Sequence, residues 1–153
     1  MTTVIADMRT GTMIADSFQE HNGNTKFCSA EKIIRNERGI FAWSGIHACG
    51  QIWLEWMMSG EDKDSRPAID EETSCIYLSD AGQLWLYNTK CIPMRIQEPY
   101  YTIGAGCEFA LAALYCDKSP LEAIRVASHF NAFTCPPFIQ YDLKSLEPTI
   151  YEA

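Results

Sequence analysis

The sequence contains three pairs of short β-prone runs, and a connection of hairpin length joins the two runs of each pair. The first pair, Thr3–Met8 and Thr12–Asp16, is separated by Arg9-Thr10-Gly11. In the second pair, a turn at 36–39 that contains glycine separates runs 32–35 and 40–43. In the third pair, a turn at 80–83 that also contains glycine separates runs 74–79 and 84–88. Because such a turn returns the chain beside the strand it has just left, each pair predicts two antiparallel strands. This pattern limits the chain to folds built on antiparallel sheets, to which residues 94–96 and 138–143 add single strands.

Three other segments have the pattern of helices. Apolar residues recur at three- and four-residue steps from Ile46 to Met58, and Gly60 is placed to end that helix. The Ala and Leu content of Cys107–Tyr115 favours a second helix. Ser119-Pro120-Leu121-Glu122 combines an N-cap serine, a proline at the first helical position and a capping-box glutamate, which predicts a third helix running to about Phe130. Helices and strand pairs in separate groups are typical of an α+β fold, in which helices cover the outer faces of packed antiparallel sheets.

Two segments are predicted to lack regular structure. Glu20–Lys26 is polar and contains Asn22-Gly23-Asn24, which is typical of a loop. The segment from Lys144 onward is predicted to be a loosely held end.

Size and charge narrow the classes of function. With 153 residues and 47% hydrophobic content, residues 1–153 are predicted to form one globular domain. The formal charge is -8 and the basic residues are scattered, which argues against a surface for nucleic acid. No apolar run approaches the ~18 residues that span a bilayer, and the N-terminus lacks a basic flank followed by an apolar stretch. We therefore expect no nucleic-acid or membrane partner.

The cysteines indicate a protein of a reducing compartment. Seven of them, at positions 28, 49, 75, 91, 107, 116 and 135, are spread along the chain without a Cys-x-x-Cys pair. An odd number at such spacings indicates neither a disulfide framework nor a zinc site. We expect buried free thiols, a cytoplasmic location, and no metal or cofactor.

The N-terminus carries a candidate nucleophile. Removal of Met1 would leave Thr2 with both a hydroxyl and a free α-amine, and an amine that titrates near ~8 can take the hydroxyl proton. A positive charge nearby would favour the alkoxide and keep the amine neutral, and Lys32 is the candidate. Asp16, at the end of the strand that returns from Thr2, is placed to balance a buried lysine. On these residues alone, an ordinary first strand, a turn aspartate and a solvated lysine remain the alternative.

A resemblance covers almost the whole chain. The Met-Thr-Thr-Val start, Trp43-Ser44-Gly45 before a helix, and Gly104-Ala105-Gly106 at a helix start resemble the proteasome β-subunit family, and the short bacterial HslV-type peptidase most of all. Four further segments occur in the same order as in that family: Ile14-Ala15-Asp16-Ser17, Gly23-Asn24-Thr25, Ala30-Glu31-Lys32-Ile33 and Ala132-Phe133-Thr134. The resemblance implies the four-layer αββα sandwich of the N-terminal nucleophile hydrolases, with the active site between the two sheets.

The same resemblance implies roles for single residues. The nucleophile, aspartate and lysine of the family fall on Thr2, Asp16 and Lys32. Gly45 is implied to offer a backbone N–H that stabilises the oxyanion. The pocket for the side chain preceding the cut is implied to be lined by Trp43, with walls from the neighbourhood of Glu20 and His47, whereas the alternative for Trp43 is core packing.

Two positions depart from the family pattern. Many members have a serine within the Gly-x-Gly segment and an aspartate after the last long helix, and both support the terminal amine. Here the serine position is occupied by Ala105 and the aspartate position by His129, which follows Ser128. Ala105 offers no side-chain hydrogen bond, while His129 is expected either to act as a polar partner or to cap the helix. The altered support predicts reduced activity.

Taken together, the residues and the resemblance predict a threonine-type endopeptidase that hydrolyses polypeptide substrates after removal of Met1. The resemblance also implies a homo-oligomeric ring fed by an ATPase unfoldase. The Ile46–Met58 helix is expected to supply core and, with its several large side chains, a subunit contact. Two alternatives remain: a non-catalytic assembly protein with the same fold, and a stand-alone amidase acting on a small molecule.

Overall fold

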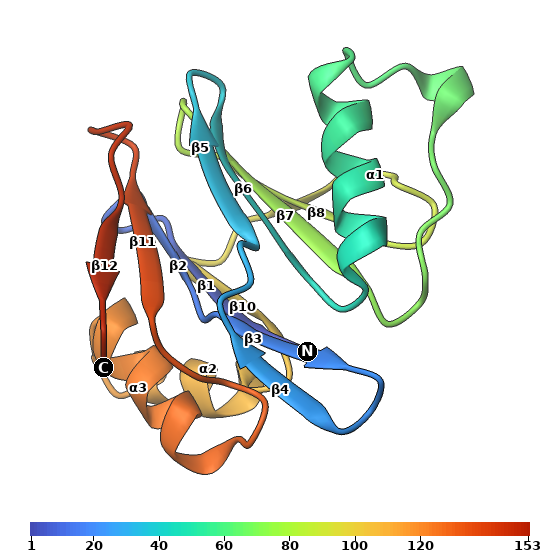
Figure 1. Cartoon of the computed structure of the whole chain (residues 1–153). Coiled ribbons are helices and arrows are strands. Elements are labelled where there is room, and N and C mark those ends of the chain that lie inside the picture. Colours follow the sequence, from blue (N-terminus) through green and yellow to red (C-terminus); the bar gives the residue numbers. More distant parts are fainter.

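A computed structural model describes all 153 residues and has four layers in the order helix, sheet, sheet, helices (Figure 1). The first sheet is antiparallel, with strand order β10-β1-β2-β11-β12. Its strands are β1 (Thr3–Asp7), β2 (Thr12–Ala15), β10 (Tyr100–Gly104), β11 (Phe138–Asp142) and β12 (Thr149–Tyr151). Helices α2 (Cys107–Tyr115) and α3 (Pro120–Phe130) pack on its outer face.

The second sheet is also antiparallel and follows sequence order, from β5 to β9. Its strands are β5 (Ile33–Asn36), β6 (Gly39–Ser44), β7 (Ser74–Ser79), β8 (Leu84–Tyr87) and β9 (Met94–Ile96). Helix α1 (His47–Met58) covers its outer face, and a short 3₁₀ turn (Lys63–Ser65) follows that helix.

The core divides according to the alternation of side chains along a strand. On β1, Val4 and Ala6 point into the cluster between the two sheets, while Ile5 packs against α2 and α3. On β6, Ile40 and Ala42 join the same inner cluster, and Phe41 and Trp43 pack against α1. Strands β1 and β6 are therefore buried on both faces, which fixes their register.

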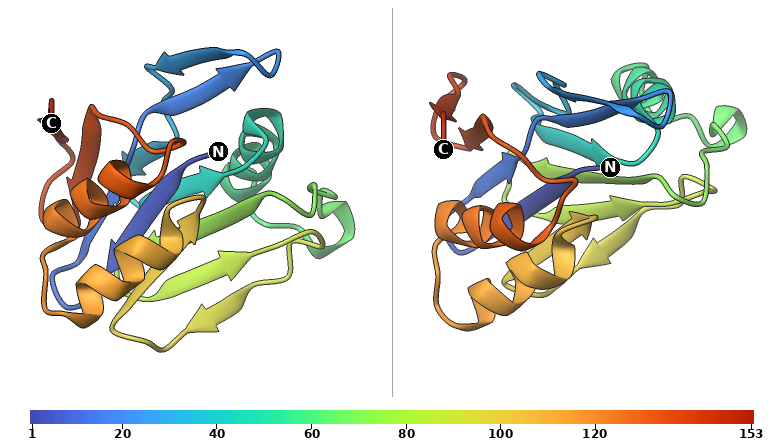
Figure 2. Two further views of the ribbon diagram at one scale, coloured as in Figure 1. Left: turned by 90° about the horizontal axis from the view of Figure 1, so that it is seen from below. Right: turned by 60° about the horizontal axis from the view of Figure 1, so that its bottom comes forward.

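A third, two-stranded sheet stands apart from the layers. β3 (Phe18–His21) and β4 (Thr25–Cys28) pair with each other and with no other strand. This hairpin projects from the layered body, as Figure 2 shows. It occupies most of the chain between Asp16 and Lys32.

The structure confirms the α+β class, the three helices and the three hairpins expected from the sequence. The capping box of α3 is present, with the Glu122 N–H donating to the Ser119 hydroxyl and the Glu122 carboxylate accepting from the Ser119 N–H. No helix is long and apolar enough to cross a membrane.

Three expectations were wrong. The segment Glu20–Lys26 is not a loop, because strands β3 and β4 extend into it from both sides. The end from Lys144 is not loose, because β12 pairs with β11 and the Arg125 side chain donates to the Ala153 carbonyl. The cysteines are not all buried free thiols, because Cys28 and Cys135 form a disulfide and, of the five free thiols, only Cys75 and Cys91 are buried. The disulfide and the Arg125 contact join segments far apart in the sequence, and the strands β3 and β4 are largely exposed, so these features leave no local signal in the sequence.

Candidate active site

Thr2 lies immediately before β1, and its backbone is held from two sides. Its carbonyl accepts a hydrogen bond of 2.7 Å from the Ala105 N–H, and the Ser44 hydroxyl lies 3.5 Å from the same oxygen. Gly104 permits this approach, since a Cβ there would lie 1.6 Å from the Thr2 oxygen and its φ of +95° is strained for other residues. The Gly104-Ala105-Gly106 segment is thus a backbone cradle for Thr2.

Lys32 lies just before β5 and points to the Thr2 hydroxyl. Only 4% of the residue is exposed. Its ammonium donates hydrogen bonds to Thr2 Oγ1 and the Phe18 carbonyl, and to the Met1 carbonyl at 2.8 Å. Burial lowers the pKa of Lys32 to about 8, an effect that the nearby Asp16 charge partly opposes.

Asp16 follows β2 and accepts three backbone hydrogen bonds. The donors are the N–H groups of Thr3, Phe18 and Cys135, at 2.9, 3.1 and 3.0 Å from the carboxylate oxygens. Burial raises the pKa of Asp16, while the Lys32 charge and these three donors favour the ionised form. Asp16 forms no ion pair within 4 Å of Lys32. Its charge therefore acts on Lys32 through space, and its direct contacts are with the backbone around Thr2.

Gly45 follows β6 and borders an open pocket. Its φ is +106°, and a Cβ there would lie 2.4 Å from the Glu72 carbonyl oxygen, so only glycine fits this turn. The Gly45 N–H donates to no acceptor within the protein, whereas the next N–H, that of Ile46, is bonded to the Thr73 hydroxyl. The pocket has a volume of about 550 Å³, and its lining includes Met1 and Gly45. Gly45, with its unbonded N–H, therefore borders the same pocket as Met1, the residue that precedes Thr2.

Met1 covers the candidate nucleophile. Thr2 has no exposed surface, while Met1 is about half exposed. The Thr2 hydroxyl donates a 2.6 Å hydrogen bond to the Met1 carbonyl, and the Thr2 nitrogen is an amide as long as Met1 is attached. Burial and, next, the Lys32 charge lower the pKa of the Met1 amine. An amine freed on Thr2 would lie still nearer to the same positive charge.

A second pocket, of about 400 Å³, lies where Trp43 and His47 meet. Trp43 Nε1 donates to His47 Nδ1 at 3.4 Å, and the Trp43 ring is almost wholly buried against α1. The remaining lining residues come from the β3–β4 segment, β5 and α1: Gln19, Ser29, Ala30, Glu31, Ile34, Gln51 and Leu54. Glu20 is exposed and borders a different hollow near Phe133, so the structure does not bring it to Trp43 and His47.

Ala105, Ser128 and His129, at the positions where the sequence departs from the family pattern, lie at different distances from the site. Ala105 lies beside Thr2 and contacts it through its backbone. Ser128 is half-buried and donates to the Thr134 carbonyl at 3.2 Å. His129 is exposed at the end of α3, where its ring packs edge-on against Phe130, so it does not reach the site.

Two further residues connect to the site, and the sequence analysis missed both. The Asn131 amide donates to the Ala105 carbonyl at 3.0 Å, and its oxygen accepts from the Thr134 hydroxyl. Thr134 is buried, and its hydroxyl lies 2.6 Å from that of Thr3. The available signal was two polar residues among apolar ones just before the Pro136-Pro137 pair, because polar groups that become buried are almost always hydrogen-bonded.

Two solved structures share the fold of this chain. HslV from Trypanosoma brucei superposes with a TM-score of 0.69 over 92% of this chain and 98% of its own, at 16% sequence identity. The chain has the HslV and proteasome β-type fold. BPH from Thiobacillus denitrificans, solved in complex with epoxomicin, superposes with a TM-score of 0.64 over the whole of both chains at 13% identity. No family model and no curated protein sequence matches the chain. The four-layer sandwich expected from the resemblance is thereby confirmed.

Proposed function

We propose that this chain is a threonine-type endopeptidase whose nucleophile is Thr2 once Met1 has been removed. One observation carries the proposal: the buried Lys32 ammonium donates to the Thr2 hydroxyl, next to a pocket bordered by Met1 and by Gly45, whose N–H has no acceptor within the protein. A hydroxyl, a cation and a free backbone donor are the groups that acyl transfer requires. The peptidase class is supported by the fold shared with HslV.

The proposed reaction begins with proton transfer from the Thr2 hydroxyl to its own α-amine. Oγ1 attacks the peptide carbonyl, and the Gly45 N–H donates to the oxyanion that forms. The amine then returns the proton to the leaving nitrogen as the C–N bond breaks, and water hydrolyses the resulting ester. Lys32 stabilises the developing alkoxide and lowers the pKa of the amine, so that the amine is neutral and basic near pH 7.

The second pocket is proposed to receive the side chain that precedes the cut. Trp43 and His47 line it together, and the buried Trp43 ring limits its depth. Gly50 leaves room for that ring, because a Cβ at position 50 would lie 2.2 Å from it. The rest of the lining is largely polar, so residue-scanned fluorogenic peptides should show a preference that changes in Trp43→Ala and not in Glu20→Ala.

We further propose that copies of this chain assemble into a ring that receives unfolded polypeptide from an ATPase. Exposed apolar side chains on α2 and α3, including the stacked rings of Phe109 and Phe130, offer contact surface beyond that of α1. Native mass spectrometry tests the assembly. A monomer that cleaves only small amides would favour the stand-alone amidase instead.

The decisive experiment joins intact mass with active-site labelling. We expect a species that lacks Met1 and gains one adduct of epoxomicin, the compound present in the BPH structure. Thr2→Ala should abolish labelling and peptide hydrolysis, while Thr2→Ser, which retains a hydroxyl and an amine, should keep part of both. Complete retention of Met1 in protein purified from its own host would refute the proposal.

One observation favours a second candidate function, that of a non-catalytic assembly protein. Ala105, whose N–H is bonded to the Thr2 carbonyl, supplies no side-chain hydroxyl to a freed amine. On that hypothesis Met1 stays attached, no electrophile labels Thr2, and the ring still forms. The same intact-mass and native-mass measurements therefore separate the two functions.

A further inference from the structure

The hairpin β3–β4 connects the two charged residues of the candidate site. Asp16 precedes β3 by two positions, and Lys32 follows β4 by four. Because neither strand pairs with the main sheets, the hairpin is held to the body by other contacts. These include the Cys28–Cys135 disulfide, an edge-on contact of the Phe18 and Phe133 rings, and hydrogen bonds from Ser17 to the carbonyls of Cys135 and Pro137.

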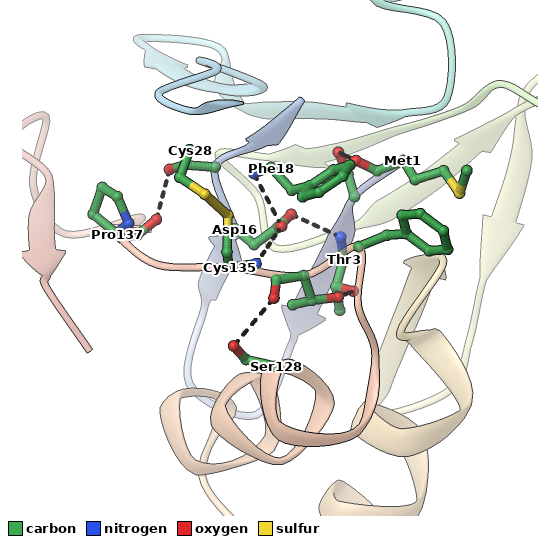
Figure 3. Close-up of a disulfide and its surroundings, with 12 residues drawn as sticks. Met1, Thr3, Asp16, Phe18, Cys28, Ser128, Cys135 and Pro137 are labelled. Atoms are coloured by element: carbon green, nitrogen blue, oxygen red, sulfur yellow. Dashed lines mark hydrogen bonds between the residues drawn. A yellow bond between two sulfur atoms is a disulfide. The ribbon is translucent and has the colours of Figure 1, made fainter. Parts of the chain in front are cut away.

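Cys135 also belongs to the segment that fixes Asp16. Its N–H donates to the Asp16 carboxylate at 3.0 Å, and its carbonyl accepts from the Ser17 N–H at 3.0 Å. The preceding Thr134 hydroxyl touches that of Thr3. Figure 3 shows the disulfide next to this group, with Asp16 receiving hydrogen bonds from Thr3, Phe18 and Cys135.

The disulfide thus ties together both segments on which the site depends. On one side, Cys28 ends the hairpin whose Phe18 carbonyl accepts from the Lys32 ammonium. On the other, Cys135 holds Asp16 directly. The bond joins residues 107 positions apart and is the only covalent link between these two segments besides the chain itself.

We propose that the Cys28–Cys135 disulfide positions Asp16 and Lys32 at Thr2, and that its reversible reduction lowers the activity of this site. This inference rests on the proposed peptidase function. A dithiol reductant would supply two electrons and two protons, so the S–S bond becomes two thiols while the reductant becomes a disulfide. Cys28 is partly exposed and Cys135 is buried, so attack would come at the Cys28 sulfur, with the Cys135 sulfur as leaving group.

The test uses the full-length, Met1-processed protein in its native assembly, before and after treatment with dithiothreitol. Alkylation followed by intact mass should count five free thiols in the oxidised protein and seven after reduction, as the assignment of the cysteines requires. Reduction should lower kcat at least about tenfold, because small displacements of catalytic groups are costly. It should also lower Tm by about 10 °C, the scale expected for opening so long a loop. Reoxidation should restore both.

A positioning role is distinguished from mere stabilisation by the pH profile. Reduction should loosen the hairpin and expose Lys32 to water. The pH at which activity falls on the alkaline side, which follows the pKa of Lys32, should then move from about 8 toward the ordinary lysine value. Cys28→Ser should behave like the reduced protein and no longer respond to dithiothreitol. Cys116→Ser, which removes an exposed free thiol, should respond as the wild type does.

Amide exchange provides a readout that does not need peptidase activity. The N–H groups of Thr3 and Phe18, both bonded to Asp16, should exchange faster after reduction. If neither the oxidised nor the reduced protein hydrolyses peptides but these two N–H groups exchange faster after reduction, the positioning role is supported and the peptidase function is refuted. The inference is overturned if the oxidised protein already has seven reactive thiols, or if reduction leaves both kcat and these two exchange rates unchanged.

Discussion

Replacement of Lys32 by methionine should remove a pH-dependent part of the protein's stability. The folded state holds Lys32 with its pKa lowered from 10.5 to about 8, chiefly because the ammonium is buried. Between those two values the unfolded chain binds a proton that the folded protein has released. Stability therefore rises with pH across this window, and the contribution is lost as the pH falls through about 8.

The size of the effect follows from the same shift. Each pKa unit corresponds to about 1.4 kcal/mol, and most of the window lies between pH 8 and 9.5. Raising the pH from 7 to 9.5 should stabilise the wild type by about 2 kcal/mol through Lys32 alone. Lys32→Met has no such group, so the free-energy difference between wild type and variant should change by that amount over the same range.

Urea unfolding followed by tryptophan fluorescence measures this difference at both pH values. The free thiols and tyrosines titrate alike in both proteins, so their contributions cancel. Protein concentration and N-terminal state, established by intact mass, must match. Lys144→Met, which replaces an exposed lysine, is the matched control and should follow the wild type at both pH values. If the free energies of unfolding of the wild type and Lys32→Met differ by the same amount at pH 7 and 9.5, burial does not destabilise the charged form of Lys32 and the argument is refuted.

Three other predictions concern the site. The kcat/KM for peptide hydrolysis should fall as pH rises through about 8, because Lys32 loses its positive charge there; a plateau to pH 10 would show that the ammonium is not needed. Asp16→Asn should lower the free energy of unfolding in urea by about 1–3 kcal/mol. The carboxylate accepts hydrogen bonds from three backbone N–H groups, and the NH₂ of an asparagine side chain cannot accept them. Gly104→Ala should lower Tm far more than Gly82→Ala. Both positions have positive φ, but only at Gly104 would a Cβ meet the Thr2 carbonyl, so equal shifts would contradict the cradle.

The layered fold could be predicted from the sequence because its signals are local. Turn residues fixed the hairpins, and the helix over Ile46–Met58 and the capping box at Ser119 lie within single segments. The β3–β4 hairpin was missed because its exposed strands carry neither a buried alternation nor an apolar run. β12 was missed because the contacts that order it, its pairing with β11 and the Arg125 hydrogen bonds to Ala153, exist only in the folded chain.

The site could be predicted only in part, for a similar reason. Thr2 and Lys32 were selected by the chemistry of a terminal nucleophile, and the structure brings them into contact. The Cys28–Cys135 bond and the Asn131 contact to Ala105 join segments far apart in sequence. No spacing rule applies to such pairs, so they could be recognised only after the sheets had placed them.

The contacts around Ala105 suggest how a freed Thr2 amine would behave. Both backbone groups of Ala105 are engaged, the N–H with Thr2 and the carbonyl with Asn131, so the missing side-chain hydroxyl leaves the cradle intact. What is lost is an acceptor that could hold the protonated amine. With Lys32 close by and no such acceptor at position 105, the ammonium form of Thr2 would be disfavoured. The amine would then be a weaker base but neutral over a wider pH range. Alanine at position 105 would therefore slow proton transfer and leave the binding of substrate unchanged.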